Sequence, residues 1–550
     1  MAITVTTDLV DISNCDTTTT NGTFYRLNGP SASNPIAEPD ARRQGVACMG
    51  YKSGTSLTPT DTGGHFNFTT TFDVTGQHVF HWRNSVTAGN TNTKANRGLA
   101  FGLTNTSTTS TTAWSTTNYK LWLLDGSDTD IQGGWVPYAV DPSGTADVSA
   151  GTLTLTTVKN CSFISRQQTA VNTNLNNILV DAIRRGTGVT ATCNSALDTI
   201  TLESIYSVDS TITNAWGIIN KYNNIYYPIG TIRIGATNQT NTCLFKDVDD
   251  VIVWRQLPVS STLYNFVLNG AASFNTTFQL GNKTGSSTSN GVVIGRVGTA
   301  VWNLTCNANT RALLYSSTFT GLNTATLTST SELEDCVFNS CGTITTSGAT
   351  ITSCGFTGHT STQLVVENPS EVNNKITTST FTSGGTGHAI QINTSSATPY
   401  EFSNLNFVGY SATNGVTGNE AVFINVLSGT VTINYAGGNL PTYRLVGGST
   451  ATVTVSSSST LELTGVEVGS EVRVYRFATA GNYDTAVEIG GTESVSTSTF
   501  TLVHTSGGTN GYISIIKFDK VPYFLELTFS SSGTQVIPVS QIVDRTASNP

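Results

Sequence analysis

Charged residues are scarce in this chain of 550 residues. Only 11% of them are Asp, Glu, Lys or Arg, against about 25% in an average globular protein. The formal net charge is −9. A negatively charged protein is repelled by DNA and by anionic membranes, so we expect no nucleic-acid partner.

Long apolar runs and helix-forming runs are also missing. No window approaches 18 uninterrupted apolar residues, and the first residues, Met1 to Asp8, carry no basic region followed by an apolar stretch. These absences predict no membrane insertion and synthesis as a soluble chain in the cytoplasm. Runs of Glu, Lys, Leu and Ala with helical period are nearly absent, which argues against a helical protein.

The nine cysteines lack the close pairs of metal and redox motifs. Cys336 and Cys354 stand 18 residues apart, the same step as Phe338 to Phe356. We therefore expect these two cysteines to stack on neighbouring coils. Synthesis in a reducing compartment favours buried free thiols over a disulfide.

The residues that are abundant indicate a folded β protein. Thr, Ser, Asn and Gly dominate, while 37% of the residues are hydrophobic and 9% are aromatic. That hydrophobic content is too high for a disordered chain. Thr and the β-branched aliphatic residues favour strands, so the predicted fold class is all-β.

A short pattern recurs in the middle of the chain: a small or apolar residue, any residue, then Phe. It ends at Phe319, Phe338, Phe356, Phe381 and Phe407, with spacings of 19, 18, 25 and 26 residues. Repeats of this period in a β-rich sequence are typical of stacked β coils. Because residues i and i+2 of a strand share a face, each Phe and the residue two before it should both point inward. The pattern predicts a short parallel β-helix.

Three regions follow from these patterns. Residues 1–257 hold six of the seven tryptophans in strand-like runs, which suits the core of a β-sandwich. Residues 258–440 contain the repeat and form the expected β-helix. Residues 441–550 hold strictly alternating segments between Gly-rich turns, which predict an antiparallel β-sandwich with Pro538 on an edge strand.

Candidate catalytic residues are few. Polysaccharide-cleaving β-helices use clustered carboxylates, but the acidic residues of the repeat region are sparse. Glu367 and Glu371 have the spacing of one strand face, with Pro369 between them favouring a loop. His359 and His388 stand in Gly-rich, turn-like surroundings and are expected to be solvated. We predict no catalytic residue, while carboxylates from different coils could still converge without any sequence signature.

Two binding sites are candidates. Asp125, Asp128 and Asp130 alternate around a Gly turn, and such oxygen ligands suit calcium, the one cofactor we consider. A polar turn explains these residues equally well. Trp114 and Trp135 stand in polar surroundings rich in Gly and Thr, and are our candidates for exposed rings that stack on a glycan.

Several segments carry a resemblance to known families. Asp247 to Gln256 resembles the last strand of jelly-roll domains in the concanavalin A-like lectin superfamily. Asp8 to Cys15, Thr93 to Ala100 and Val180 to Gly188 look like segments of phage-encoded structural proteins. The chain as a whole resembles bacteriophage virion surface proteins of the tail-fibre, tailspike and head-fibre type. The resemblance implies a jelly-roll N-terminal domain, assembly in the host cytoplasm and display on the virion.

Three functions remain open at this point. The first is a non-enzymatic virion structural protein, either a receptor-binding tail fibre or a capsid decoration. The second is a tailspike depolymerase that cleaves host surface polysaccharide, and the third is a bacterial adhesin. The expected partners are other virion proteins, a host cell-surface glycan and two further copies in a homotrimer. The scarcity of candidate carboxylates favours the first function.

Overall fold

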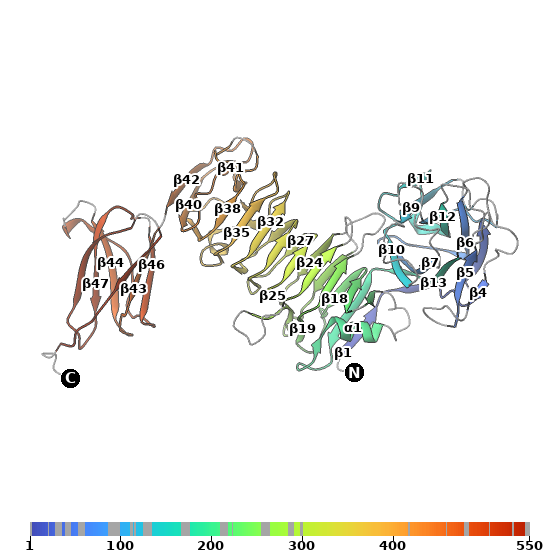
Figure 1. Ribbon diagram of the computed structural model, residues 1–550, viewed down its shortest axis with the longest axis horizontal. Coiled ribbons are helices and arrows are strands. Elements are labelled where there is room, and N and C mark those ends of the chain that lie inside the picture. Colours follow the sequence, from blue (N-terminus) through green and yellow to red (C-terminus); the bar gives the residue numbers. More distant parts are fainter. Residues whose placement is uncertain are drawn as a thin grey trace. The chain divides into compact units, whose positions relative to one another are not determined.

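The computed structural model describes residues 3–544, except 20, 28–35, 39–45, 53–60, 86–98, 110–113, 115–116, 125–134, 167–176, 210–217, 223, 255–263, 284–290, 297–300, 416–417, 458, 478–482, 505 and 531–532. The chain divides into two compact units, Met1–Ala325 and Thr326–Pro550. Strands dominate both, and α1 (Leu202–Asp209) is the one α-helix of the described residues. The all-β class is therefore confirmed (Figure 1).

The first unit contains a two-layer sandwich near its N-terminus. One sheet has the strand order β10-β7-β13-β5-β4, with β2 also paired to β13, and the other has the order β11-β9-β8-β12-β6-β3. Their bounds are β2 Val10–Ser13, β3 Gly22–Leu27, β4 Ile36–Glu38, β5 Cys48–Lys52, β6 Asp61–Phe72, β7 His78–Ser85, β8 Leu99–Thr104, β9 Tyr119–Leu124, β10 Trp135–Val140, β11 Val148–Ala150, β12 Val158–Arg166 and β13 Asn177–Gly186. All described pairs in these two sheets are antiparallel.

Alternation along the strands gives this sandwich two apolar clusters. Phe101 and Phe163 point into the main core between the sheets, together with Met49 and Tyr51 of the facing sheet. The next residues along the same strands, such as Ile164, point to the opposite face and join a smaller cluster. Successive residues of a strand face opposite sides, so one sheet contributes to both clusters.

The rest of the first unit is a stack of parallel coils, which we call the first coil stack. Three sheets share its strands. The first has the order β1-β14-β18-β21-β24-β27, the second β15-β19-β22-β25 and the third β16-β17-β20-β23-β26. Their bounds are β1 Ile3–Thr7, β14 Gly188–Cys193, β15 Thr199–Ile200, β16 Ile219–Tyr222, β17 Ile225–Pro228, β18 Thr231–Ile234, β19 Cys243–Asp247, β20 Val251–Trp254, β21 Tyr264–Leu268, β22 Thr276–Leu280, β23 Val293–Arg296, β24 Trp302–Cys306, β25 Thr310–Tyr315, β26 Thr318–Thr320 and β27 Leu322–Thr326.

This stack begins earlier than the sequence predicted. Parallel pairing starts with β14 and β18, about 70 residues before the expected boundary at 257. β20, which lies in the segment read as the last jelly-roll strand, pairs in parallel with β17 and β23. The N-terminal strand β1 also belongs to the stack, because it pairs antiparallel with β14. The sandwich therefore lies between two segments of the coil stack in sequence.

The second unit opens with further parallel coils, the second coil stack. Its three sheets have the orders β30-β33-β36-β39-β41, β28-β31-β34-β37-β40-β42 and β29-β32-β35-β38. Their bounds are β28 Glu332–Glu334, β29 Val337–Asn339, β30 Thr343–Thr345, β31 Thr350–Thr352, β32 Gly355–His359, β33 Leu364–Val366, β34 Ile376–Thr377, β35 Thr380–Ser383, β36 Ile390–Ile392, β37 Tyr400–Ser403, β38 Asn406–Val408, β39 Val422–Ile424, β40 Thr430–Ala436, β41 Tyr443–Leu445 and β42 Thr452–Ser457.

The Phe repeat forms a ladder inside this stack. Phe338, Phe356, Phe381 and Phe407 occupy matching positions of adjacent strands. Their ring centroids are 5.0, 4.8 and 5.6 Å apart and the rings are nearly parallel. The residues two before these Phe are also buried, namely Cys336, Cys354, Ser379 and Leu405. The inward direction predicted for both positions is confirmed.

A single left-handed residue precedes each strand of this ladder by two positions. Asp335, Ser353, Thr378 and Asn404 have φ values of 55°, 55°, 52° and 53°. The turn between the second and third sheets of each coil is thus made the same way each time. Asn and Asp tolerate this conformation, whereas a β-branched residue such as Thr378 is strained in it.

The C-terminal part of the second unit is a smaller sandwich. One sheet has the order β46-β43-β49 and the other β45-β44-β47-β48. Their bounds are β43 Ser459–Thr464, β44 Glu471–Phe477, β45 Ala486–Thr492, β46 Thr499–His504, β47 Asn510–Ile516, β48 Tyr523–Thr528 and β49 Gly533–Pro538. β43 and β49 pair in parallel, which departs from the expected antiparallel pattern. Pro538 does end an edge strand, as its missing N–H requires.

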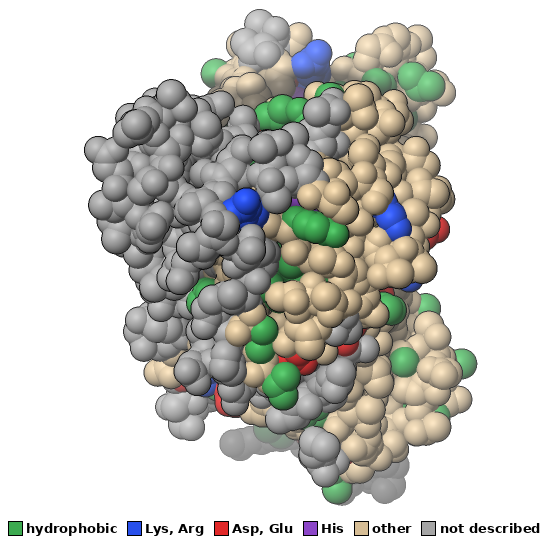
Figure 2. All heavy atoms as spheres, turned by 90° about the vertical axis from the view of Figure 1, so that its right-hand side faces the viewer, with side chains coloured by type: hydrophobic (Ala, Val, Ile, Leu, Met, Phe, Trp, Pro, Cys, Tyr) green, Lys and Arg blue, Asp and Glu red, His purple; other side chains and the backbone are tan. Residues whose placement is uncertain are grey.

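All nine cysteines are free and buried, as the sequence predicted. Among the described residues, no helix is both long and apolar enough to cross a membrane. On the face of the molecule drawn in Figure 2, uncharged side chains and backbone cover most of the described surface.

Candidate polar pocket in the second unit

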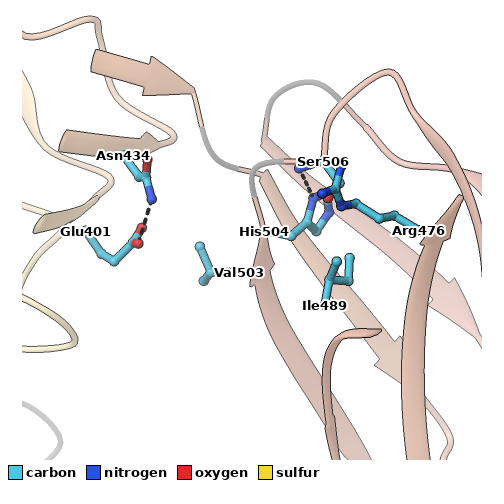
Figure 3. A pocket seen from close by; sticks show the side chains of 7 residues that line it. All are labelled: Glu401, Asn434, Arg476, Ile489, Val503, His504 and Ser506. Carbon is cyan, nitrogen blue, oxygen red and sulfur yellow. Dashed lines mark hydrogen bonds between the residues drawn. The ribbon is translucent and has the colours of Figure 1, made fainter. Parts of the chain in front are cut away.

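Several polar side chains of the second unit converge on a pocket of about 360 Å³. One wall comes from the coil stack and the other from the C-terminal sandwich (Figure 3). The lining residues are Glu401, Asn434, Arg476, Ile489, Val503, His504 and Ser506. They offer a carboxylate, an amide, a guanidinium, an imidazole and a hydroxyl group beside two aliphatic side chains.

Strand register positions the coil-stack wall. Glu401 of β37 pairs with Asn434 of β40, which pairs with Ser456 of β42. The Asn434 Nδ2 donates to Glu401 Oε1 at 2.8 Å, and Ser456 Oγ donates to Asn434 Oδ1 at 2.9 Å. Asn373 accepts from the Glu401 backbone N–H at 2.8 Å. A row of polar side chains across parallel strands therefore holds the carboxylate in place.

One oxygen of this carboxylate remains without a partner. Glu401 Oε2 is buried and has no hydrogen-bond partner among the described residues. Burial raises the pKa of Glu401, and the hydrogen bond from Asn434 partly opposes that shift. In its ionised form, Oε2 is an acceptor that a ligand hydroxyl could satisfy.

His504 supplies the complementary group from the sandwich wall. Its side chain is buried, and Nδ1 accepts from the Ser506 backbone N–H at 3.2 Å. Burial lowers the pKa of His504, so the ring is neutral near pH 7 and carries its proton on Nε2. That Nε2 is buried and has no acceptor in the part of the chain that the structure describes. The pocket thus presents one unsatisfied acceptor and one unsatisfied donor.

The remaining lining residues differ in character. Arg476 is exposed and can offer several N–H donors. Val503 is 39% exposed and Ile489 is half-buried, so both give the pocket a small apolar surface. Figure 3 shows Glu401 and Asn434 on one side, with Val503, Ile489, His504, Ser506 and Arg476 toward the other.

The residues proposed from sequence for glycan stacking lie elsewhere, in the first unit. Trp114 is only 7% exposed and packs with Leu121 and Ile164, its ring 5.3 Å from that of Tyr119. The expectation of an exposed Trp114 ring is therefore wrong. Trp135 is half-buried at the start of β10, an edge strand, and its role stays a prediction.

The calcium site stays a prediction as well. Asp125, Asp128 and Asp130 lie outside the described residues. Within the part of the chain that the structure describes, no group of three or more His, Cys, Asp or Glu side chains is placed to hold a metal ion.

The two histidines of the repeat region were expected in solvent, and this expectation is wrong. His359 is fully buried, and its Nε2 lies 2.5 Å from the hydroxyl of Tyr410. Burial and the nearby His388 lower the pKa of His359 to about 4. His388 is 8% exposed, with Nδ1 2.7 Å from the Glu420 carbonyl oxygen. The burial of both histidines keeps a large substrate away from them.

Glu367 and Glu371 have structural contacts. Glu371 is 8% exposed and accepts from Thr346 Oγ1 at 3.2 Å and from the Glu367 backbone N–H at 3.0 Å. The Glu367 carboxylate accepts from Asn393 Nδ2 at 2.7 Å. Pro369 opens a short 3-10 helix between them, so they do not share a strand face.

Sequence reasoning did not find the polar pocket. Glu401 was one acidic residue among several, and Asn434 is 33 positions away on the next coil. His504 lies at the end of a strand in a different sheet. No local spacing joins these residues, so only strand register and the packing of the second unit reveal the site.

Comparisons with known proteins add little to this geometry. The chain matches no protein-family model and no curated protein. One similar solved structure is titled as that of an exo-beta-agarase, with 13% identity, a TM-score of 0.21, and coverage of 33% of this chain and 24% of that one. Another is the Agl-KA catalytic domain, with 10% identity, a TM-score of 0.17, and coverage of 80% and 98%. This chain spans about a quarter of the agarase chain. At these scores neither likeness bears on function.

Proposed function

We propose that this protein is a non-enzymatic virion surface protein that binds a host cell-surface glycan in the polar pocket of its second unit. The observation that carries the proposal is the unsatisfied pair of polar atoms, Glu401 Oε2 and His504 Nε2. Leaving such groups unpaired costs about 1–3 kcal/mol each, so a ligand that satisfies both gains affinity. A sugar hydroxyl can donate to the carboxylate, and another can accept from the imidazole.

The pocket suits a sugar in other respects. A volume of about 360 Å³ falls in the range of small-molecule sites. Val503 and Ile489 can contact the C–H groups of a sugar ring, while Arg476 can donate to its oxygens. Neighbouring ladder bonds hold Glu401 and Asn434, so little side-chain entropy is lost on binding.

Binding is favoured over cleavage. Most glycosidases use two carboxyl groups about 5–10 Å apart, one as acid and the other as nucleophile or base. Of the described residues that line this pocket, only Glu401 carries a carboxyl group. A depolymerase therefore remains the second candidate, supported by the raised pKa of Glu401, which suits a general acid.

The virion part of the proposal has separate support. Coils stacked in register present side chains on a rigid scaffold, as a displayed attachment protein needs. The resemblance of Asp8 to Cys15 and of Val180 to Gly188 to phage-encoded segments points the same way. We also propose that the protein assembles as a homotrimer and contacts other virion proteins.

The binding experiment compares the native protein with point variants on an array of bacterial surface glycans, followed by calorimetry on any hit. Glu401→Gln should weaken binding about tenfold or more, since a hydrogen bond to a charged group contributes about 1.5–3 kcal/mol. His504→Phe keeps an aromatic ring beside Phe529 and removes the Nε2 donor, so it should weaken binding to a similar extent. Glu526→Gln, at an exposed position of β48, is the matched control and should bind normally.

Three results would overturn the proposal. Equal binding by the native protein and both pocket variants would remove the pocket from the mechanism. Release of new reducing ends or unsaturated sugars from a bound glycan would show an enzyme. Labelling of the purified particle with an antibody to this chain tests the virion assignment, which fails if no particle carries it.

A further inference from the structure

Two cysteines of the first coil stack lie in contact although they are 50 residues apart in sequence. Cys193 ends β14 in the first sheet, and Cys243 begins β19 in the second. The Cys193 backbone N–H donates to Cys243 Sγ at 3.0 Å. The Cys193 thiol donates to the Asp198 backbone oxygen at 3.3 Å, and the Cys243 thiol donates to Gln239 Oε1 at 3.5 Å. Parallel neighbours hold both strands, β18 beside β14 and β22 beside β19. The contact is therefore part of the coil geometry.

One of these two cysteines, Cys193, lines a pocket near the molecular surface, whereas Cys243 is not among the residues that line it. Cys193 lines a pocket of about 280 Å³ together with amide side chains, among them Asn194, Asn238 and Asn241. Cys193 is 6% exposed, whereas Cys243 is fully buried behind it. A small reagent that enters the pocket therefore meets Cys193 first.

The local electrostatics separate the two thiols. The contact with the Cys243 side chain lowers the pKa of Cys193, against the opposing effects of burial and the Asp198 carboxylate. The same contact and burial raise the pKa of Cys243. Because the thiolate is the nucleophile in thiol chemistry, Cys193 is the more reactive member of the pair.

We propose that Cys193 and Cys243 form a thiol modification site that reacts with small disulfides and closes to an internal disulfide. The Cys193 thiolate attacks one sulfur of the small disulfide, whose S–S bond breaks and releases one thiolate. Cys243 then attacks the Cys193 sulfur, its proton passes to solvent, and the second small thiolate leaves. Two protein thiols are oxidised and one small disulfide is reduced to two thiols.

The cysteines that stack on neighbouring coils of the second coil stack are in a different environment. Cys336 and Cys354 are 0% and 2% exposed and donate to the backbone carbonyl oxygens of Glu334 and Thr352. Cys336 is therefore a suitable internal comparison for reactivity.

The test treats the folded, reduced protein with cystamine and follows the intact mass and the peptide map. The native protein should lose two hydrogen atoms and yield a cross-linked peptide that joins Cys193 to Cys243. Cys243→Ser should stop at one cysteamine group on Cys193, since no resolving thiol remains. Cys193→Ser should stay unmodified at Cys243, and Cys336→Ser should behave as the native protein does.

The modification rates of individual cysteines give the most sensitive test. In Cys243→Ser, modification of Cys193 should exceed that of Cys336 by about tenfold or more because of access to the reagent. Circular dichroism and tryptophan fluorescence establish that each variant is folded before treatment. An unmodified Cys193 in folded native protein, a stable cysteamine adduct there, or a cross-link between other cysteines would each overturn the proposal.

Discussion

Truncation of Phe356 tests whether the aromatic ladder holds the second coil stack together. Its side chain is fully buried, and its ring lies 5.0 Å from Phe338 at an angle of 12° and 4.8 Å from Phe381 at an angle of 8°. Phe356 thus has a stacking partner on each side. Phe356→Ala therefore removes one rung from the middle of the ladder.

The expected loss can be worked out from these contacts. Replacing a buried Phe with Ala costs about 3–5 kcal/mol through lost transfer energy and the cavity that remains. The ring has stacking neighbours above and below, and each aromatic pair contributes about 0.5–1.5 kcal/mol beyond area burial. We expect a loss near the upper end, about 4–5 kcal/mol. Phe356→Leu retains most of the volume and should cost clearly less.

Hydrogen exchange measured by mass spectrometry is the appropriate assay. All seven tryptophans precede residue 303, so tryptophan fluorescence reports only on the first unit. Peptides that cover Cys354 to His359 and the coils on either side should lose protection, because coils contact mainly their neighbours. The fluorescence melting curve of the first unit should remain unchanged and serves as an internal control.

Val408→Ala is the matched control for this experiment. Val408 stands beside the ladder residue Phe407 on the same strand but is 49% exposed. Its truncation should change stability by about 0.5 kcal/mol or less. The reasoning is refuted if Phe356→Ala costs under about 1 kcal/mol, or if the loss of protection is no greater near Phe356 than in the C-terminal sandwich.

Two further predictions concern backbone strain and pH. Thr378 is exposed, with φ of 52°. Thr378→Asn should stabilise the second unit by about 0.5–1 kcal/mol, because Asn tolerates the left-handed conformation better than Thr does. At the equivalent position of the next coil, Asn404→Thr should destabilise the unit by a similar amount; hydrogen exchange measures both changes. In the first unit, burial and the neighbouring Asp250 raise the pKa of Asp247, whose carboxylate accepts from the Leu202 N–H at the start of α1. Because its pKa is raised in the folded state, Asp247 binds its proton more tightly there than in the unfolded chain. The stability gained in this way is fully present below the unfolded-state pKa and is lost as the pH rises through the folded-state pKa. The fluorescence melting temperature of the first unit should fall as the pH rises above about 4, the ordinary pKa of Asp, and Asp247→Asn should flatten that slope. An unchanged slope in the variant would contradict the assignment.

Local sequence determined the fold class and the ladder. Thr and β-branched residues prefer strands wherever they are placed, so composition alone predicted an all-β chain. The Phe repeat predicted both the stacking of Phe338 on Phe356 and the inward direction of Cys336, because strand alternation has a period of two. The free state of the cysteines followed from their spacing and the expected reducing compartment.

The start of the coil stack could not be found in the same way. In the earlier coils the ladder position is occupied by Tyr226, Ile252 and Ile294, which pair in register with spacings of 26 and 42 residues. Turns of varying length hide the period, and the residue type changes from Phe to Ile. Only strand pairing reveals that these segments belong to the coils and not to the sandwich.

Tertiary structure alone decided which side chains meet. Trp114 has polar neighbours in sequence, yet its ring packs in an apolar cluster, because a strand's second face can also be covered. His359 and His388 stand in Gly-rich, turn-like sequence, yet both are buried. Glu401 and His504 line one pocket although 103 positions separate them. Sequence patterns record local preferences along the chain, whereas burial and convergence depend on contacts between distant segments, which register and packing create.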